Sequence, residues 1–309
     1  MDQGGSTRRT HVIAIGNQKG GVGKTTNTVH IAAALAEMGR KCLIFDLDMN
    51  HGATRHFGIA SDAFLGAFEV LTGDEQPLDV ILTAAEDNDD DVELPENLDL
   101  IPSRRKLEKI DQALVAKNKF LVTQDVLVEP LRQLRGLYDY IFLDTAPNAT
   151  TPTIAAYKSA DWFILSAIPD PFAIAGLSDA LTDIQDAQRS GNPKLRLLGV
   201  VLSSVDKRTS LANSLTDYVE KIFTPDGMSH SAKFENLISR STVIPQTQER
   251  GRTLFKTHPT HKVTDQYRQL AAEIEARLKA MLGEPVTKPA GEVLPKVAAQ
   301  MMEAAVANG

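Results

Sequence analysis

The stretch Lys19-Gly20-Gly21-Val22-Gly23-Lys24-Thr25-Thr26 decides the fold of this 309-residue chain. Its glycines let successive backbone N–H groups turn toward an anion without interference from Cβ atoms. A phosphate-binding loop also needs a lysine for the β- and γ-phosphates and a hydroxyl for Mg²⁺, which Lys24 and Thr25 supply. Gln18 replaces the usual first glycine, and Lys19 adds a second cation at the mouth of the loop.

The residues on both sides of this octet predict a strand, a tight loop and a helix. Residues 11–15 are a short apolar run with β-branched side chains, typical of a buried strand. Apolar residues recur at helical spacing over residues 27–38, and Gly39 is suited to end that helix. The loop amides and the helix dipole then point the same way, which makes an anion site. The alternative, a glycine-rich turn that arose by chance, would not be expected to have such a strand before it and such a helix after it.

Two further strands are predicted to end in carboxylates. The apolar residues 43–45 lead to Asp46, and Asp48 follows two positions later. Residues 138–143 lead to Asp144, a pattern typical of a Walker B strand whose carboxylate holds Mg²⁺ directly or through water. Residues 161–166 read as another strand, and residues 172–177 open a helix. This order predicts an α/β fold: a mostly parallel twisted sheet flanked by helices on both faces, with nucleotide at the C-terminal ends of the strands.

The octet and this order of elements resemble the deviant Walker A ATPases, the class that includes ParA/Soj, MinD, nitrogenase iron protein and ArsA. Residues 43–54 are similar to the second ParA motif, although residues 49–52 read Met-Asn-His-Gly in place of Pro-Gln-Gly-Asn. Ala146 and Asn148 depart from the usual Asp-Thr-Pro-Pro. The single Cys42 argues against an iron protein, which needs two cluster thiolates per subunit. The similarity covers about residues 11–282, which favours a small ParA/Soj-type partition ATPase.

The resemblance implies a weak basal ATPase that uses ATP and Mg²⁺ as an ATP-sandwich homodimer. The residues expected to bind ATP are Gly20, Gly21, Val22, Gly23, Lys24, Thr25, Thr26 and, from a late loop, Pro245. Thr25 and Asp144 are expected around Mg²⁺, with Asp46 supporting the metal or the geometry of the loop after it. Asp48 is the candidate for orienting the attacking water. Lys24 and Lys19 complete the catalytic set, and Lys19 is expected to reach the partner's ATP as an arginine finger does.

The net charge of −7 hides two segments of opposite sign. Residues 74–99 contain eleven Asp or Glu and no Lys or Arg, and the stretch 86–91 reads as a solvated loop. Residues 233–268 contain seven Lys or Arg against three carboxylates, which suits contact with the DNA backbone without base reading. An ordinary mixed surface is the alternative. The predicted DNA contacts, just after a strand end at residues 244–245 and at one earlier loop, are Arg250, Arg252, Lys256 and Arg208.

Three segments are expected: a flexible arm over residues 1–10, one P-loop ATPase domain over residues 11–282, and a tail over residues 283–309 with a possible short helix. The arm is too short for the helix-turn-helix domain of larger plasmid ParA proteins. No run of 18 apolar residues occurs, so a cytoplasmic protein without membrane contact is expected.

The resemblance further implies nonspecific double-stranded DNA and a ParB-type centromere-binding protein as partners, with the protein associated with the nucleoid. Two alternatives remain open. One is a MinD-like positioning ATPase on a membrane surface, although the amphipathic helix expected at residues 263–282 carries both charges on its outer face. The other is a nucleotide-gated scaffold that binds neither DNA nor lipid.

Overall fold

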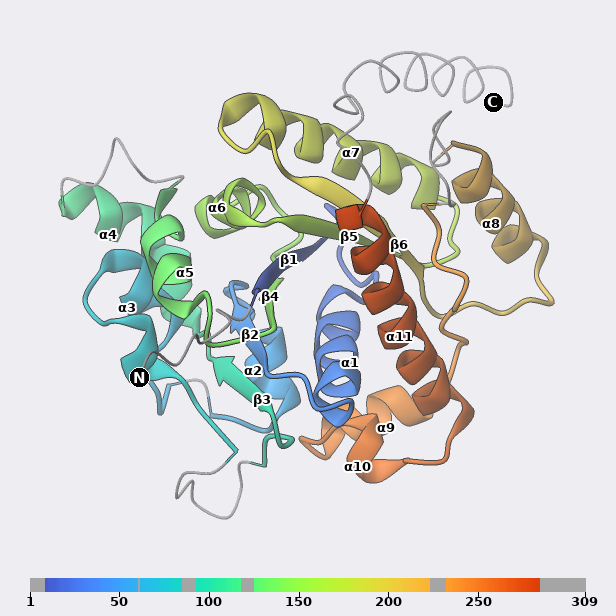
Figure 1. The fold of residues 1–309 in the computed structure, drawn as a ribbon, viewed down its shortest axis with the longest axis horizontal. Helices are drawn as coiled ribbons and strands as arrows, with labels where there is room; N and C mark the ends of the chain where they lie inside the picture. The colour runs from blue at the N-terminus through green and yellow to red at the C-terminus, as the bar shows by residue number, and fades with distance from the viewer. Residues whose placement is uncertain (1–8, 61, 85–92, 118–124, 223–231, 284–309) are drawn as a thin grey trace, which may run out of the picture.

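The computed structural model describes residues 9–60, 62–84, 93–117, 125–222 and 232–283. Six strands form one parallel sheet in the order β3-β2-β4-β1-β5-β6 (Figure 1). The strands are β1 (His11–Gly16), β2 (Cys42–Asp46), β3 (Leu98–Ile101), β4 (Tyr140–Asp144), β5 (Trp162–Ala167) and β6 (Arg196–Leu202). The predicted α/β fold is confirmed. Most of the predicted arm, the acidic stretch 86–91 and the tail from residue 284 lie outside the described residues.

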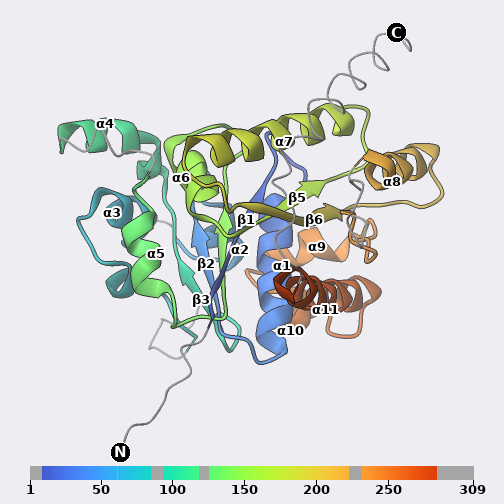
Figure 2. The same ribbon diagram turned by 45° about the horizontal axis from the view of Figure 1, so that its top comes forward.

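Helices cover both faces of the sheet, so strands β2, β4 and β5 are buried along their whole length. One core contains residues of α3 (Ala67–Thr72), α4 (Ile110–Ala116), α5 (Val128–Leu134), α6 (Thr151–Ser159), α7 (Ala173–Ser190) and α8 (Ser210–Ile222). The other contains residues of α1 (Lys24–Glu37), α2 (Gly52–His56), α10 (Leu254–Thr257) and α11 (Lys262–Gly283). Figure 2 shows α6 and α7 on one side of the sheet and α1 and α11 on the other. The 3₁₀ helices are η1 (Pro77–Val80) and η2 (Arg105–Lys109).

Helix α1 begins directly after the glycine-rich loop and is held along its length by α11. The buried side chains of α11 include Tyr267, Leu270 and Ile274, which pack in the same core as α1. At the far end, Arg268 of α11 pairs with Glu37 at 2.7 Å. The chain then turns at Gly39, whose φ of 82° is the left-handed conformation predicted for the end of this helix.

The prediction that residues 244–245 end a strand is wrong. Ile244 and Pro245 lie in the first turn of α9 (Val243–Glu249). Pro245 has no N–H, but the first four N–H groups of a helix have no partner within the helix, so proline fits there. The pairing that continues the end of β6 is instead a short bridge between Val205 and Ser239.

Candidate nucleotide-binding site

The glycine-rich loop runs from the end of β1 to the start of α1 at the C-terminal edge of the sheet. Gly21 and Gly23 have φ of 74° and 87°, the left-handed region that disfavours any side chain. The first side of the loop is held by Asn17, whose Nδ2 donates to the carbonyl of Ser166 at 2.8 Å and whose Oδ1 accepts from the N–H of Lys19 at 2.9 Å. The loop therefore has the backbone shape that the octet predicts.

Lys24 lies across this loop and is 7% exposed. Its Nζ donates to the carbonyl of Lys19 at 2.9 Å. Burial lowers the pKa of Lys24, while the nearby carboxylates of Asp144 and Asp48 oppose the shift. A desolvated ammonium at the centre of a loop of N–H groups is an arrangement that polyphosphate would compensate.

An oxygen-rich cluster lies at the start of α1. The hydroxyl of Thr25 donates to Oδ2 of Asp144 at 2.8 Å, and that of Thr28 donates to Oδ1 at 3.0 Å. Asp46 is the register partner of Asp144 on the neighbouring strand, and both are fully buried. Burial, together with the charge of Asp46, raises the pKa of Asp144 far above its usual range. Buried carboxylates with a hydroxyl beside them form a donor set that fits Mg²⁺.

Asp46 holds the loop that follows β2. Its Oδ2 accepts from the N–H and the hydroxyl of Thr54 at 2.9 and 2.8 Å, and its Oδ1 accepts from the N–H of Asp48 at 3.2 Å. Of the two roles expected for Asp46, these contacts correspond to support of the loop. A direct bond to the metal stays a prediction.

Asp48 is 8% exposed, and its Oδ1 accepts from the N–H and the side-chain amide of Asn50 at 2.8 and 3.0 Å. The loop then passes beside the nucleotide site, because a Cβ on Gly52 would lie 3.0 Å from Oγ1 of Thr25. The loop of residues 48–52 thus contacts the metal-side residues of the site. The water-orienting role of Asp48 stays a prediction.

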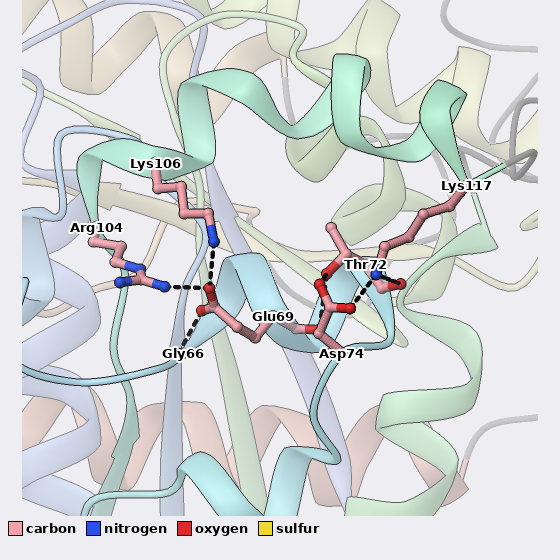
Figure 3. Close-up of polar contacts among 7 residues, drawn as sticks. All are labelled: Gly66, Glu69, Thr72, Asp74, Arg104, Lys106 and Lys117. Carbon is pink, nitrogen blue, oxygen red and sulfur yellow. Dashed lines mark hydrogen bonds and ion pairs between the residues drawn. The ribbon is translucent and has the colours of Figure 1, made fainter.

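Ser103, which the sequence analysis did not select, supports this loop from below. Its hydroxyl donates to the carbonyl of Asp48 and its N–H donates to Oγ1 of Thr54, both at 2.8 Å. The next residue, Arg104, pairs with the buried Glu69 of α3, as does Lys106 at 3.1 Å (Figure 3). The position of Ser103 directly after β3, at the same edge as Asp46, was the available signal.

A second pair of contacts in Figure 3 lies at the other end of α3. Thr72 donates to Asp74 at 2.6 Å, and Lys117 pairs with the same carboxylate. Together with the ion pairs of Glu69, these contacts join α3 to η2 and α4. The segment that contains Ser103 and Arg104, which contacts residues 48–54, is thereby held against α3.

Lys19 stands at the mouth of the loop, outside the anion side that Lys24 occupies. Its Nζ lies 2.5 Å from Asp170 and 5.4 Å from the centre of the Phe172 ring, which is 71% exposed. The neighbouring Gln18 donates to Asp183 of α7 at 2.8 Å. The segment just before α7 therefore holds Lys19 and the second half of α7 holds Gln18, the two residues that distinguish this loop from the usual motif.

Helix α9 reaches the loop through a residue that the sequence analysis missed. Gln248 donates to Oγ1 of Thr26 at 3.2 Å. Pro245, three residues earlier, is exposed, and its contact with nucleotide stays a prediction. No local motif marks Gln248, because its contact depends on how α9 packs against α1 and α2.

The predicted DNA contacts fall into two groups. Arg252 and Lys256 both pair with Glu93, at 3.0 and 2.7 Å, and Arg250 is exposed beside them. Arg208 follows β6 and pairs with Asp206 at 2.7 Å. That these cations form one patch stays a prediction.

Arg208 also lines a groove with cations outside the four predicted DNA contacts. The groove has a volume of about 400 Å³ and lies between the end of β6, the segment before α9 and the start of α11. Its charged lining residues are Asp206, Lys207, Arg208, Arg240 and Lys262. We call this the basic groove. Arg240 and Lys262 belong to the cationic segment 233–268, which the charge count of the sequence had identified. That count did not show that they lie beside Lys207 and Arg208.

The fold and this site together define a P-loop ATPase. A family model described as an AAA domain matches residues 10–197. The chain is 30% identical to the sporulation initiation inhibitor protein Soj of Bacillus subtilis, over 86% of this chain and 98% of that protein. It is equally identical to the chromosome-partitioning ATPase Soj of Thermus thermophilus, over 86% and 96%. The chain belongs to the ParA/Soj-type ATPases.

A solved structure with bound nucleotide agrees with the P-loop ATPase fold. Cobyrinic acid a,c-diamide synthase of Mycobacterium smegmatis, with bound ADP and magnesium, superimposes with a TM-score of 0.70 at 26% identity, over 91% of this chain and all of that one. Across the part of our chain that the structure describes, no helix combines the length and apolar character needed to cross a membrane.

Proposed function

We propose that this chain is a DNA-partition ATPase whose ATP-bound dimer binds nonspecific double-stranded DNA. Hydrolysis, stimulated by a ParB-type centromere-binding protein, then separates the dimer and releases the DNA. The observation that carries the proposal is the pair of lysines at the loop: Lys24 is buried on the anion side, and Lys19 is one-third exposed on the rim. The name of the Thermus thermophilus relative, a chromosome-partitioning ATPase, supports chromosome partition as the process. The protein would act in the cytoplasm, on the nucleoid.

ATP with Mg²⁺ is the cofactor that the donor set fits. Lys24 and the loop N–H groups bind the β- and γ-phosphates, and Thr25 and Asp144 hold the metal. When bound, Mg²⁺ would neutralise charge on the phosphates and orient them for attack. Asp48 orients the water through its carboxylate, since the two bonds from Asn50 both go to Oδ1 and leave acceptor positions for the water. Asp46 holds the loop that carries Asp48.

Lys19 acts across the dimer. It must leave Asp170, which it contacts at 2.5 Å, before its ammonium reaches the partner's phosphates. Because that ion pair is partly exposed, breaking it costs about 1 kcal/mol or less, far below what a cation in a desolvated phosphate site contributes. Nucleotide in both protomers therefore supplies the energy that moves Lys19.

DNA contact would use the two cationic surfaces, the basic groove and the segment with Arg250, Arg252 and Lys256. The second surface directly follows α9, which contacts the glycine-rich loop through the bond from Gln248 to Thr26. A dimer presents each surface twice. Doubling the number of phosphate contacts makes binding depend on ATP and fall steeply with salt.

A gel shift with unrelated DNA tests the proposal. Wild-type protein should bind with ATP, should bind far less without it, and should lose binding in Lys24→Ala. Replacing Arg250 and Arg252 with Glu should abolish binding while ATP-dependent dimerisation survives. The control replaces Arg105 and Arg132, two exposed cations on η2 and α5, with Glu and should leave binding unchanged. DNA binding indifferent to ATP would refute the proposal.

The same protein preparation separates the two alternatives. A membrane-surface ATPase would sediment with anionic liposomes in ATP, and a cytosolic scaffold would dimerise with ATP yet ignore both DNA and liposomes. The packing of α11 argues against the first, because its apolar side chains, including Tyr267, Leu270 and Ile274, are buried in the core. Glu275 and Arg277, which were expected on the outer face of this helix, are buried as well. The apolar face is therefore covered and cannot insert into a lipid surface.

A further inference from the structure

A buried hydrogen-bond network lies beneath the glycine-rich loop and is centred on Asn27 of α1. Asn27 is fully buried, and its Nδ2 donates to Oγ of Ser166 at 2.8 Å. Ser166 in turn donates to the carbonyl of Val22 at 2.7 Å. In a trans peptide the C=O and the next N–H point in opposite directions, so this bond turns the N–H of Gly23 toward the anion side. Asn27 thus helps to set the direction of a phosphate-binding amide.

The oxygen of the same side chain fastens two distant elements. Oδ1 of Asn27 accepts from the hydroxyl of Ser203 at 3.0 Å and from that of Tyr267 at 2.9 Å. An amide oxygen has two lone pairs, and both are used here. Ser203 directly follows β6 and Tyr267 belongs to α11, so one residue ties the loop to the end of β6 and to α11.

The chain beyond Ser203 is strained and leads to the basic groove. Ser204 has φ of 56°, a left-handed conformation that a residue other than glycine adopts only where its surroundings hold it. Val205 then bridges to Ser239, and Asp206 to Arg208 line the groove. Ser203 itself is held by two hydrogen bonds, one from its N–H to the carbonyl of Ala167 at 2.8 Å and one from its hydroxyl to Asn27 at 3.0 Å. The bond to Asn27 is the one that connects this segment to the glycine-rich loop.

We infer that Asn27 and Ser203 couple nucleotide occupancy of the loop to the conformation of residues 203–208, and thereby to the cations of the basic groove, within a single protomer. The inference rests on the proposed function, since it takes the nucleotide as the ligand of the loop. Phosphates bind the N–H side of the Val22–Gly23 peptide, and the network holds its carbonyl side. A ligand that favours one orientation of this peptide favours the arrangement of Ser203 that is compatible with it. Asn27 and Ser203 are therefore positioning residues for the DNA-binding surface.

Hydrogen exchange with ADP and Mg²⁺ tests the coupling. ADP lacks the γ-phosphate that Lys19 would reach across a dimer, so the measurement concerns one protomer. In wild-type protein, ADP should slow exchange in the loop and also over residues 203–209 by about five-fold or more, the lower end of typical coupling between sites. Ser203→Ala should keep the slowing in the loop and lose it over residues 203–209.

Two further variants distinguish coupling through the bond between Asn27 and Ser203 from a general increase in the flexibility of the protein. Tyr267→Phe removes the other donor to Asn27 but leaves Ser203 bonded, so its response should match wild type. Tyr218→Phe on α8 removes a buried hydroxyl that has no hydrogen-bond partner among the described residues, and it should also match wild type. The inference is overturned if ADP protects the loop of wild-type protein but not residues 203–209, or if Ser203→Ala keeps both responses. ADP that protects neither segment and shows no heat of binding would overturn the proposed nucleotide site, and the inference with it.

Discussion

Glu93 forms ion pairs with two of the cations proposed to contact DNA, Arg252 and Lys256. Neutralising Glu93 is therefore the sharpest test of that surface. Its carboxylate lies 2.7 Å from Lys256 and 3.0 Å from Arg252. The hydrogen bond from Lys256, with the two nearby charges, lowers the pKa of Glu93, so it is ionised at neutral pH. A phosphate group must displace this carboxylate to reach either cation. We predict that Glu93→Gln strengthens DNA binding by the ATP-bound protein.

The magnitude follows from the number of cations released. Partly exposed ion pairs contribute about 1 kcal/mol or less each, so the gain at fixed salt should be about five-fold or less per pair. Two new phosphate contacts would steepen the salt slope by up to about 1.8, at roughly 0.9 per contact. A rise from about 50 to about 200 mM salt would then cost the variant about 12-fold more affinity than it costs wild type.

Fluorescence anisotropy of a labelled duplex of unrelated sequence, titrated at several salt concentrations with ATP, measures both quantities. Glu108→Gln is the matched control, since Glu108 pairs with Arg105 on η2, away from the proposed surface, and it should change neither affinity nor slope. Equal slopes for wild type and Glu93→Gln, in a protein that binds DNA, would refute the role of Arg252 and Lys256.

Four further outcomes are expected. Lys24→Ala should abolish tight ATP binding because the triphosphate loses its desolvated cation; calorimetry that finds unchanged affinity would contradict this. Lys19→Ala should bind ATP but neither dimerise nor turn over, and a full ATP-dependent dimer in light scattering would count against it. Asp48→Ala should dimerise with ATP yet hydrolyse about 10²–10⁴-fold more slowly; loss of ATP binding would make Asp48 structural. Burial lowers the pKa of His30 to about 3 and of His56 to about 4, so both fold neutral. The two neutral histidines contribute fully to the free energy of unfolding above the unfolded pKa of about 6.5, and this contribution is lost as the pH falls below that value toward the folded pKa. Urea unfolding at about pH 5 rather than pH 7 should therefore show a loss of about 2 kcal/mol per histidine, reduced in His30→Asn, and an equal loss in both proteins would refute the assignment.

Short-range sequence features determined the fold and the phosphate loop. The octet at residues 19–26 contains the glycines, the lysine and the hydroxyl in consecutive positions, so no distant residue is needed to recognise the motif. Asp46 and Asp144 each follow an apolar run, and parallel strands bring their C-terminal ends to one edge, which made their proximity predictable. The segment at residues 243–245 was mistaken for a strand because three residues carry too little periodicity to distinguish the two structures.

The partners of the site's side chains depended on tertiary structure alone. Lys19 contacts Asp170, Gln248 bonds Thr26 across 222 positions, and Glu93 joins cations that the sequence placed far from it. Such contacts are set by sheet order and by how helices pack, which no local pattern encodes. The sequence therefore determined which groups could bind ATP. Only the packed structure decided which of them hold one another, and where the strained segment after Ser203 meets the basic groove.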